Sequence, residues 1–122
     1  MSDEFLTKLP TREFIQGDTF TIAFQFTDMD DGVIIPNASQ ITWNLCTYDY
    51  YETVVLSLNG TNNSSQIKVD NKTGIVYITL TSSNTINLRD GKYIQQPILT
   101  HEGSTYIRAW GEVIFRRKVG GA

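Results

Sequence analysis

The 122-residue sequence predicts a single all-β domain, a sandwich of two antiparallel sheets. Two observations support this prediction: apolar and polar residues alternate along several short segments, and clusters of turn-forming residues separate those segments. The clearest alternation is at residues 19–27, where every second residue from Phe20 to Phe26 is apolar, so that one face of a strand is buried. One core fits the chain length, because domains cluster near ~100–150 residues.

The remaining elements follow in order along the chain. Alternation resumes around Trp43, and Gly74 can supply the positive φ angle that a tight hairpin needs. The expected strands cover about residues 19–27, 41–45, 53–58, 67–69, 75–80, 93 onward and 105–118, with one helical turn at 83–88. The side chains expected to be nearly buried are those of Phe20, Ile22, Phe24, Trp43, Val76, Ile78 and Val113. The sequence therefore predicts an immunoglobulin-like antiparallel β-sandwich of about seven strands.

Residues 1–16 lack a sustained period and are too apolar for a solvated tail. We expect them to form an N-terminal arm outside the sandwich, which would occupy residues 17–118 and be followed by a short tail at residues 119–122. The apolar side chains of Phe5, Leu6 and Leu9 would dock on a neighbouring subunit, by strand addition or by insertion into a groove. The arm is accordingly a candidate protein interface.

Several short motifs of the sandwich carry a family resemblance. They are Gly17-Asp18-Thr19-Phe20, Ile41-Thr42-Trp43, the run from Gly74 to Thr81, Leu88-Arg89-Asp90-Gly91-Lys92-Tyr93 and Gly111-Glu112-Val113. In this order they resemble the immunoglobulin-like domain of tailed-bacteriophage structural proteins, such as the N-terminal domain of phage baseplate upper proteins. The resemblance covers residues 17–118.

The resemblance implies a non-enzymatic structural subunit of a virion, in the tail, baseplate, neck or capsid. Its partners would be other virion subunits, and it would assemble as a symmetric homo-oligomer that hides open sheet edges. The protein would be synthesised in the host cytoplasm and reside in the virion. The alternative is a carbohydrate-binding or adhesion module.

The composition argues against other classes of partner. The net charge is −3, and only residues 116–118 gather basic side chains, so we expect no nucleic-acid partner. No apolar run approaches the ~18 residues of a membrane span, and the N-terminus carries acids where a signal peptide carries basic residues. The single cysteine, Cys46, is expected to be a buried apolar group, because one cysteine cannot form an internal disulfide.

Catalytic and metal-binding patterns are weak. His101 is the only histidine and lies at an expected hairpin tip, where an exposed surface residue is favoured over a general base. The acidic cluster of Asp28, Asp30 and Asp31 does not match the spacing of a calcium loop, which favours a turn held by side-chain hydrogen bonds. We therefore expect no enzymatic activity, no cofactor and no metal ion.

The last strand carries the remaining candidate site. If Val113 points inward, then Trp110, Glu112 and Ile114 point outward, and an outward Trp beside an Ile forms an apolar surface patch. Three explanations compete: a subunit interface anchored by the aromatic ring, a sugar-stacking platform, or cover by the N-terminal arm of the same chain. The interface is favoured over the sugar site, because the sequence shows no polar partners for a sugar.

Overall fold

The computed structural model describes residues 4–27, 32–48, 53–101 and 105–117. Their strands and short helices, in chain order, are β1 (Glu4–Lys8), β2 (Arg12–Ile15), β3 (Phe20–Phe24), β4 (Phe26–Thr27), β5 (Val33–Ile34), the 3₁₀ turn η1 (Ala38–Gln40), β6 (Ile41–Thr47), β7 (Val54–Asn59), β8 (Ile67–Val69), β9 (Val76–Leu80), α1 (Ser82–Thr85), β10 (Gly91–His101) and β11 (Thr105–Arg116). The expected acidic cluster at residues 28–31 and the tail at residues 119–122 lie outside the described residues.

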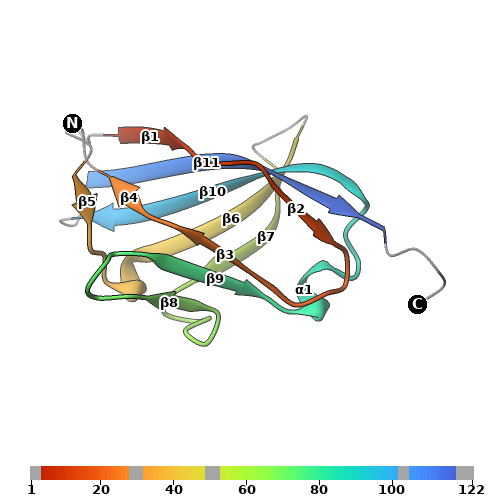
Figure 1. The fold of residues 1–122 in the computed structure, drawn as a ribbon, viewed down its shortest axis with the longest axis horizontal. Helices are drawn as coiled ribbons and strands as arrows, with labels where there is room; N and C mark the ends of the chain where they lie inside the picture. Colours follow the sequence, from red (N-terminus) through yellow and green to blue (C-terminus); the bar gives the residue numbers. More distant parts are fainter. Residues whose placement is uncertain (1–3, 28–31, 49–52, 102–104, 118–122) are drawn as a thin grey trace.

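Two sheets pack face to face and form the sandwich (Figure 1). The larger sheet has the order β1-β11-β10-β6-β7, with β2 also paired to β11, and the smaller sheet has the order β3-β9-β8. A two-stranded hairpin, β4-β5, continues from β3. This division of strands between the sheets is that of an immunoglobulin-like domain, so the predicted fold class is confirmed.

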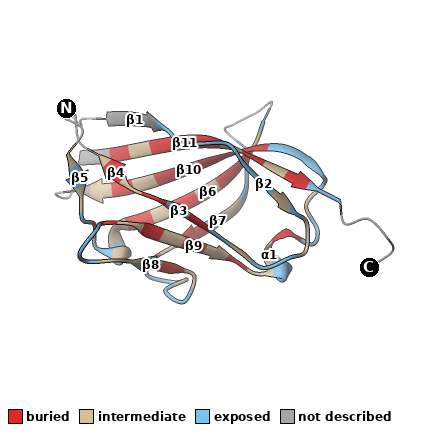
Figure 2. Ribbon diagram, in the orientation of Figure 1, coloured by how far each residue is buried: buried red, intermediate tan, exposed pale blue. Residues whose placement is uncertain are grey.

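The core lies between the sheets and contains buried residues of both layers, which are red on the ribbon of Figure 2. Trp43 at its centre is fully buried, as predicted. Its indole Nε1–H donates a hydrogen bond to Oε1 of Gln95, at 2.9 Å. Of the residues expected in the core, Ile22, Phe24, Trp43, Val76, Ile78 and Val113 are buried. Phe20 is only half-buried, because it lies at the sandwich margin and stacks on Phe14 with ring centroids 3.8 Å apart.

A turn between the two sheets precedes β10. The predicted helical turn is found as α1, and Leu88 packs against the core just after it. The Tyr93 hydroxyl then donates a 2.6 Å hydrogen bond back to the carbonyl of Arg89. In antibody domains a tyrosine at this corner stands two residues before the second disulfide cysteine. Here that position is Gln95, so the central tryptophan meets an amide in place of a disulfide.

The N-terminal segment belongs to the sandwich, which corrects the expected boundary at residue 16. Both β1 and β2 run parallel to β11 and pair with it. Between them Leu9 is buried, at 8% exposure, and its backbone N–H donates to the carbonyl of Trp110 at 2.7 Å. Leu9 crosses closely over Gly111, where a Cβ would lie 3.0 Å from the Leu9 Cβ. The parallel pairing was missed because β1 and β2 are short and lie about a hundred residues from β11 in the sequence.

Replacing Trp43 with Ala should lower the free energy of unfolding by roughly 3–5 kcal/mol, the usual cost of removing a large aromatic side chain from a packed core. The change also removes the indole N–H that donates to the Gln95 side chain, and Gln95 is itself buried. Urea denaturation followed by circular dichroism measures the change. Trp110→Ala is the control, because Trp110 lies on the outward side of β11; an equal loss in both variants would contradict this description of the core.

Replacing Leu9 with Ala should lower the free energy of unfolding by roughly 2 kcal/mol or more, because the side chain is buried against β11 and the cavity left cannot close fully. The matched control is Thr11→Ala, since Thr11 is exposed in the same connection between β1 and β2. Denaturation midpoints of the two variants provide the test. A Leu9→Ala protein as stable as the control would show that the N-terminal segment is not anchored in the core.

Candidate interaction surfaces

The outward face of the larger sheet is the first candidate surface. We call it the outer sheet face. Its side chains come from alternate positions of four neighbouring strands and point away from the core, as the cross-strand register requires. They are Arg108, Trp110, Glu112 and Ile114 of β11, Lys92, Ile94, Gln96 and Ile98 of β10, Thr42, Asn44 and Cys46 of β6, and Val54, Ser57 and Asn59 of β7.

One cross-strand row of this face is polar and continues from Trp110. Gln96 of β10 and Trp110 of β11 both lie between the same two cross-strand pairs of these strands. Gln96 pairs on its other side with Asn44 of β6, and Asn44 pairs with Ser57 of β7. The Ser57 hydroxyl donates a 2.7 Å hydrogen bond to Oδ1 of Asn44. The Cys46 thiol donates to Oε1 of Gln96 at 3.8 Å. These links hold the amides in fixed positions beside the tryptophan.

A second row of the same face is apolar. Ile94 of β10 pairs with Cys46 of β6, and Cys46 pairs with Val54 of β7. The row becomes more open toward the edge of the sheet: Ile94 and Cys46 are buried, whereas Val54 is 47% exposed. Burial also raises the pKa of the Cys46 thiol. Cys46 is thus a buried apolar group, as expected from the sequence.

Trp110 has a partner within its own chain. The Lys8 ammonium nitrogen of β1 lies 5.2 Å from the centroid of the Trp110 ring, a distance at which a cation is attracted to the ring face. Trp110 is half-buried. The explanation in which the chain's own N-terminal segment covers Trp110 therefore holds in part, and the ring keeps some exposed surface.

The structure separates the predicted interface residues into two groups. Trp110, Glu112 and Ile114 lie half-buried on the outer sheet face, so the predicted facing of the last strand is confirmed. Leu9 is wrong as an interface residue, because it is buried within its own core. The backbones of Phe5 and Leu6 pair with Ile107 and Arg108 in β11, and their side chains lie outside the described residues, as does that of His101.

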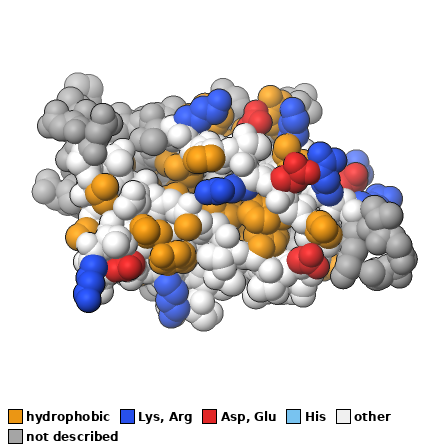
Figure 3. All heavy atoms as spheres, in the orientation of Figure 1, with side chains coloured by type: hydrophobic (Ala, Val, Ile, Leu, Met, Phe, Trp, Pro, Cys, Tyr) orange, Lys and Arg blue, Asp and Glu red, His pale blue; other side chains and the backbone are white. Residues whose placement is uncertain are grey.

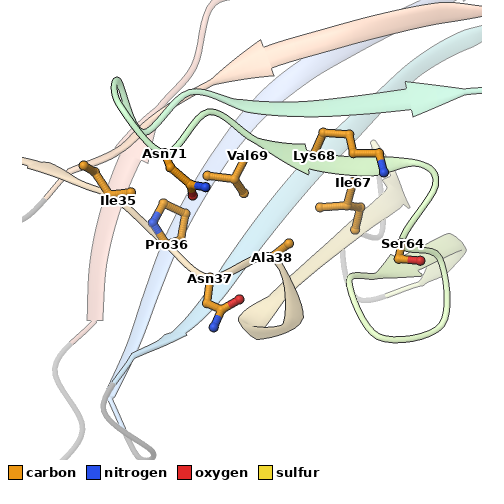
Figure 4. A pocket seen from close by; sticks show the side chains of 9 residues that line it. All are labelled: Ile35, Pro36, Asn37, Ala38, Ser64, Ile67, Lys68, Val69 and Asn71. Carbon is orange, nitrogen blue, oxygen red and sulfur yellow. The ribbon is translucent and has the colours of Figure 1, made fainter.

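The second candidate surface is a groove on the other sheet, which sequence analysis missed. We call it the β8 groove (Figure 4). It is an open groove with a volume of about 580 Å³. Its walls are residues Ile35, Pro36, Asn37 and Ala38 on one side, and Ser64, Ile67, Lys68, Val69 and Asn71 on the other. These segments are some thirty residues apart, so no local pattern places them together.

Apolar surface continues from this groove around the end of the smaller sheet. Ile35 is 52% exposed, and Val33 and Ile35 both approach Gly74 in the β8-β9 hairpin. Figure 3, which views the molecule from the side of β3 and β9, shows hydrophobic side chains near the β8-β9 end beside lysine and acidic side chains. Further hydrophobic side chains lie across the middle of that view, beside a basic side chain.

Metal-ligating side chains do not gather on either surface in the described part of the chain. Within that part of the chain, no three His, Cys, Asp or Glu side chains are placed to hold a metal ion. The helices described there are also too short and too polar to cross a membrane. The two surfaces carry apolar area and hydrogen-bonding groups.

Comparison with known proteins supports the fold. No protein-family model matches the sequence, and no curated protein does. Among solved structures, the chain is similar to InlP of Listeria monocytogenes, with a TM-score of 0.52 and 15% identity over 91% of this chain. The first immunoglobulin-like domain of the human CD48 antigen gives a TM-score of 0.38 and 13% identity, with 96% of this chain and 87% of that chain covered.

The extent of the similarity limits what it implies. This chain spans 27% of the InlP chain, and a similarity at 15% identity concerns the fold alone. The fold defines the chain as an immunoglobulin-like β-sandwich domain.

Proposed function

We propose that this chain is a non-enzymatic structural subunit that works through protein-protein contacts, with the outer sheet face as its contact surface. The observation that supports the proposal is the composition of that face. It combines Trp110, Ile114 and Ile98 with the charged side chains Arg108 and Glu112 at its β11 border. Aromatic and arginine side chains are enriched at protein interfaces and commonly act as their anchors.

The proposed partner is a second copy of the chain in a symmetric assembly. A flat sheet face can pack on an identical face across a two-fold axis, so that each residue of the pair contributes twice. The half-buried side chains of Trp110, Ile98 and Ile114 would supply the apolar part of such a contact, and the polar row with Asn44 and Gln96 would lie beside them. The polar row is continuous across strands, which suits the packing of one sheet on another.

A carbohydrate-binding or adhesion role is the second candidate, and one observation favours it. Trp110 lies on the same face as Gln96 and Asn44, which are the polar partners that the sequence did not reveal. The Lys8 ammonium group over the Trp110 ring opposes this role, because a sugar would need that ring surface for stacking. The protein contact therefore remains the preferred proposal.

Replacing Trp110 with Ala separates the two candidates. For an assembly anchor, self-association measured by sedimentation velocity should weaken by more than ~2 kcal/mol, the cost typical of an interface hot spot. Tyr77→Ala is the matched control, because Tyr77 is a half-buried aromatic residue on β9 of the other sheet. Unchanged self-association with loss of signal on a glycan array would favour the sugar site, and equal effects of both variants would contradict a specific role for Trp110.

The setting that we propose is the virion of a tailed bacteriophage. Its support is the order of the five sandwich motifs from Gly17 to Val113, together with an immunoglobulin-like fold that spans the same residues. We expect the coding gene to lie among tail or capsid genes, and we expect mass spectrometry of purified particles to detect the chain in several copies. Metabolic genes on both sides would overturn this setting and leave the contact surface itself in place.

A further inference from the structure

The β8 strand forms an open edge of the smaller sheet. It pairs with β9 on one side, and in the described part of the chain no strand pairs with its other side. Two backbone hydrogen bonds show that Gln66 and Asp70 point their backbone groups toward β9. The amide of Thr79 donates to the carbonyl of Gln66, and the amide of Asp70 donates to the carbonyl of Ile75. Since hydrogen-bonding positions alternate along a strand, the backbone groups of Ile67 and Val69 point to the open side.

The open edge faces the β8 groove. In Figure 4 the side chains of Ile67 and Val69 extend from β8 toward Ala38 and Pro36, and Lys68 extends from the other side of the strand. Pro36 has no N–H group, so the opposite wall cannot complete a ladder with β8 through that residue. The groove therefore presents unpaired backbone groups beside an apolar floor, which is the combination that extended peptides recognise.

The positive charge of Lys68 at this edge favours a peptide with an acidic residue over a second copy of the chain. Lys68 is the single ionised side chain among the residues that line the groove. A second copy is disfavoured, because the antiparallel register that pairs all three β8 residues of both copies sets one Lys68 opposite the other, and like charges at opposed positions destabilise a sheet. An acidic residue opposite Lys68 would instead be attracted. At this non-hydrogen-bonded position the paired side chains approach most closely.

We propose that the β8 groove binds an extended peptide segment of another protein by adding it as an antiparallel strand to β8. The peptide would carry an acidic residue opposite Lys68 and aliphatic residues on either side of it. Those two aliphatic side chains would enter the groove above Ile67 and Val69, and the peptide backbone would pair with the outward groups of the same two residues. This site goes beyond the outer sheet face, which lies on the other sheet.

The test uses the full chain and the capped peptide Gly-Thr-Val-Glu-Val-Thr-Gly, followed by NMR of the isotope-labelled protein. We expect saturable shifts of amide signals in β8 and in residues 35–38, and slower hydrogen exchange at the amides of Ile67 and Val69. Signals of the outer sheet face, including the Trp110 indole, should not move. The proposal thus fails separately from the proposed function, which depends on that face.

Two variants test the mechanism. Lys68→Glu should weaken binding of the glutamate peptide at least tenfold and should gain binding of the same peptide with lysine in place of glutamate. Val69→Pro should abolish binding and leave a folded domain by circular dichroism, because its lost N–H faces the open side and proline is tolerated at such edge positions. The control is Lys72→Glu, the same charge change in the neighbouring hairpin and outside the groove lining, with binding expected within twofold of the unchanged protein.

Three results would overturn the proposal. The first is the absence of shifts in the unchanged protein at millimolar peptide. The second is equal binding by the Lys68→Glu and Lys72→Glu variants, which would show that only net charge matters. The third is self-association that Val69→Pro abolishes, which would assign the β8 edge to a second copy.

Discussion

The buried hydrogen bond between Trp43 and Gln95 is the interaction on which the larger sheet depends. Both side chains are excluded from water, so the bond forms in an environment where an unpaired indole N–H or amide oxygen is costly. It connects β6 and β10 in one register. A slip of one residue would turn every side chain of either strand to the opposite face, and the outer sheet face would lose both its polar and its apolar row.

The N-terminal segment decides which sheet edges stay open. A sandwich of this topology would leave β11 as an edge strand, and exposed edges promote unwanted pairing. Here β1 and β2 cover that edge in succession, with Leu9 anchored over Gly111 and an ion pair between Arg116 and Glu13. The outer edges of β7 and β8 receive no such cover from the described residues. Of these two uncovered edges, the β8 edge is the one at which we propose a peptide contact.

Features with a local cause could be predicted from the sequence. The alternation around Phe24 and Trp43 fixed their burial, the same period placed Trp110 and Ile114 outward, and the turn before Tyr93 was visible as a short motif. Features that depend on distant segments could not be predicted. Nothing near Leu9 indicates that it packs on Gly111, and nothing near Pro36 indicates that it faces Val69, because such contacts arise only when the sandwich closes. Phe20 also shows this limit. The alternating pattern predicts that its side chain points toward the core, but the pattern does not predict how close the residue lies to the margin of the sandwich.

The two surfaces suit different kinds of contact, and this difference follows from their shapes and charges. The outer sheet face is broad and carries both a positive and a negative side chain, Arg108 and Glu112, at its β11 border. Two copies of this face can therefore pack together with opposite charges near each other. The β8 edge is three residues long with a lysine at its centre, so that full pairing with its own copy brings two cations together. A subunit with this arrangement can assemble through one sheet and still hold an acidic strand of a different protein on the other. Because the two sheets face opposite sides of the sandwich, occupation of the groove would leave the assembly contact accessible.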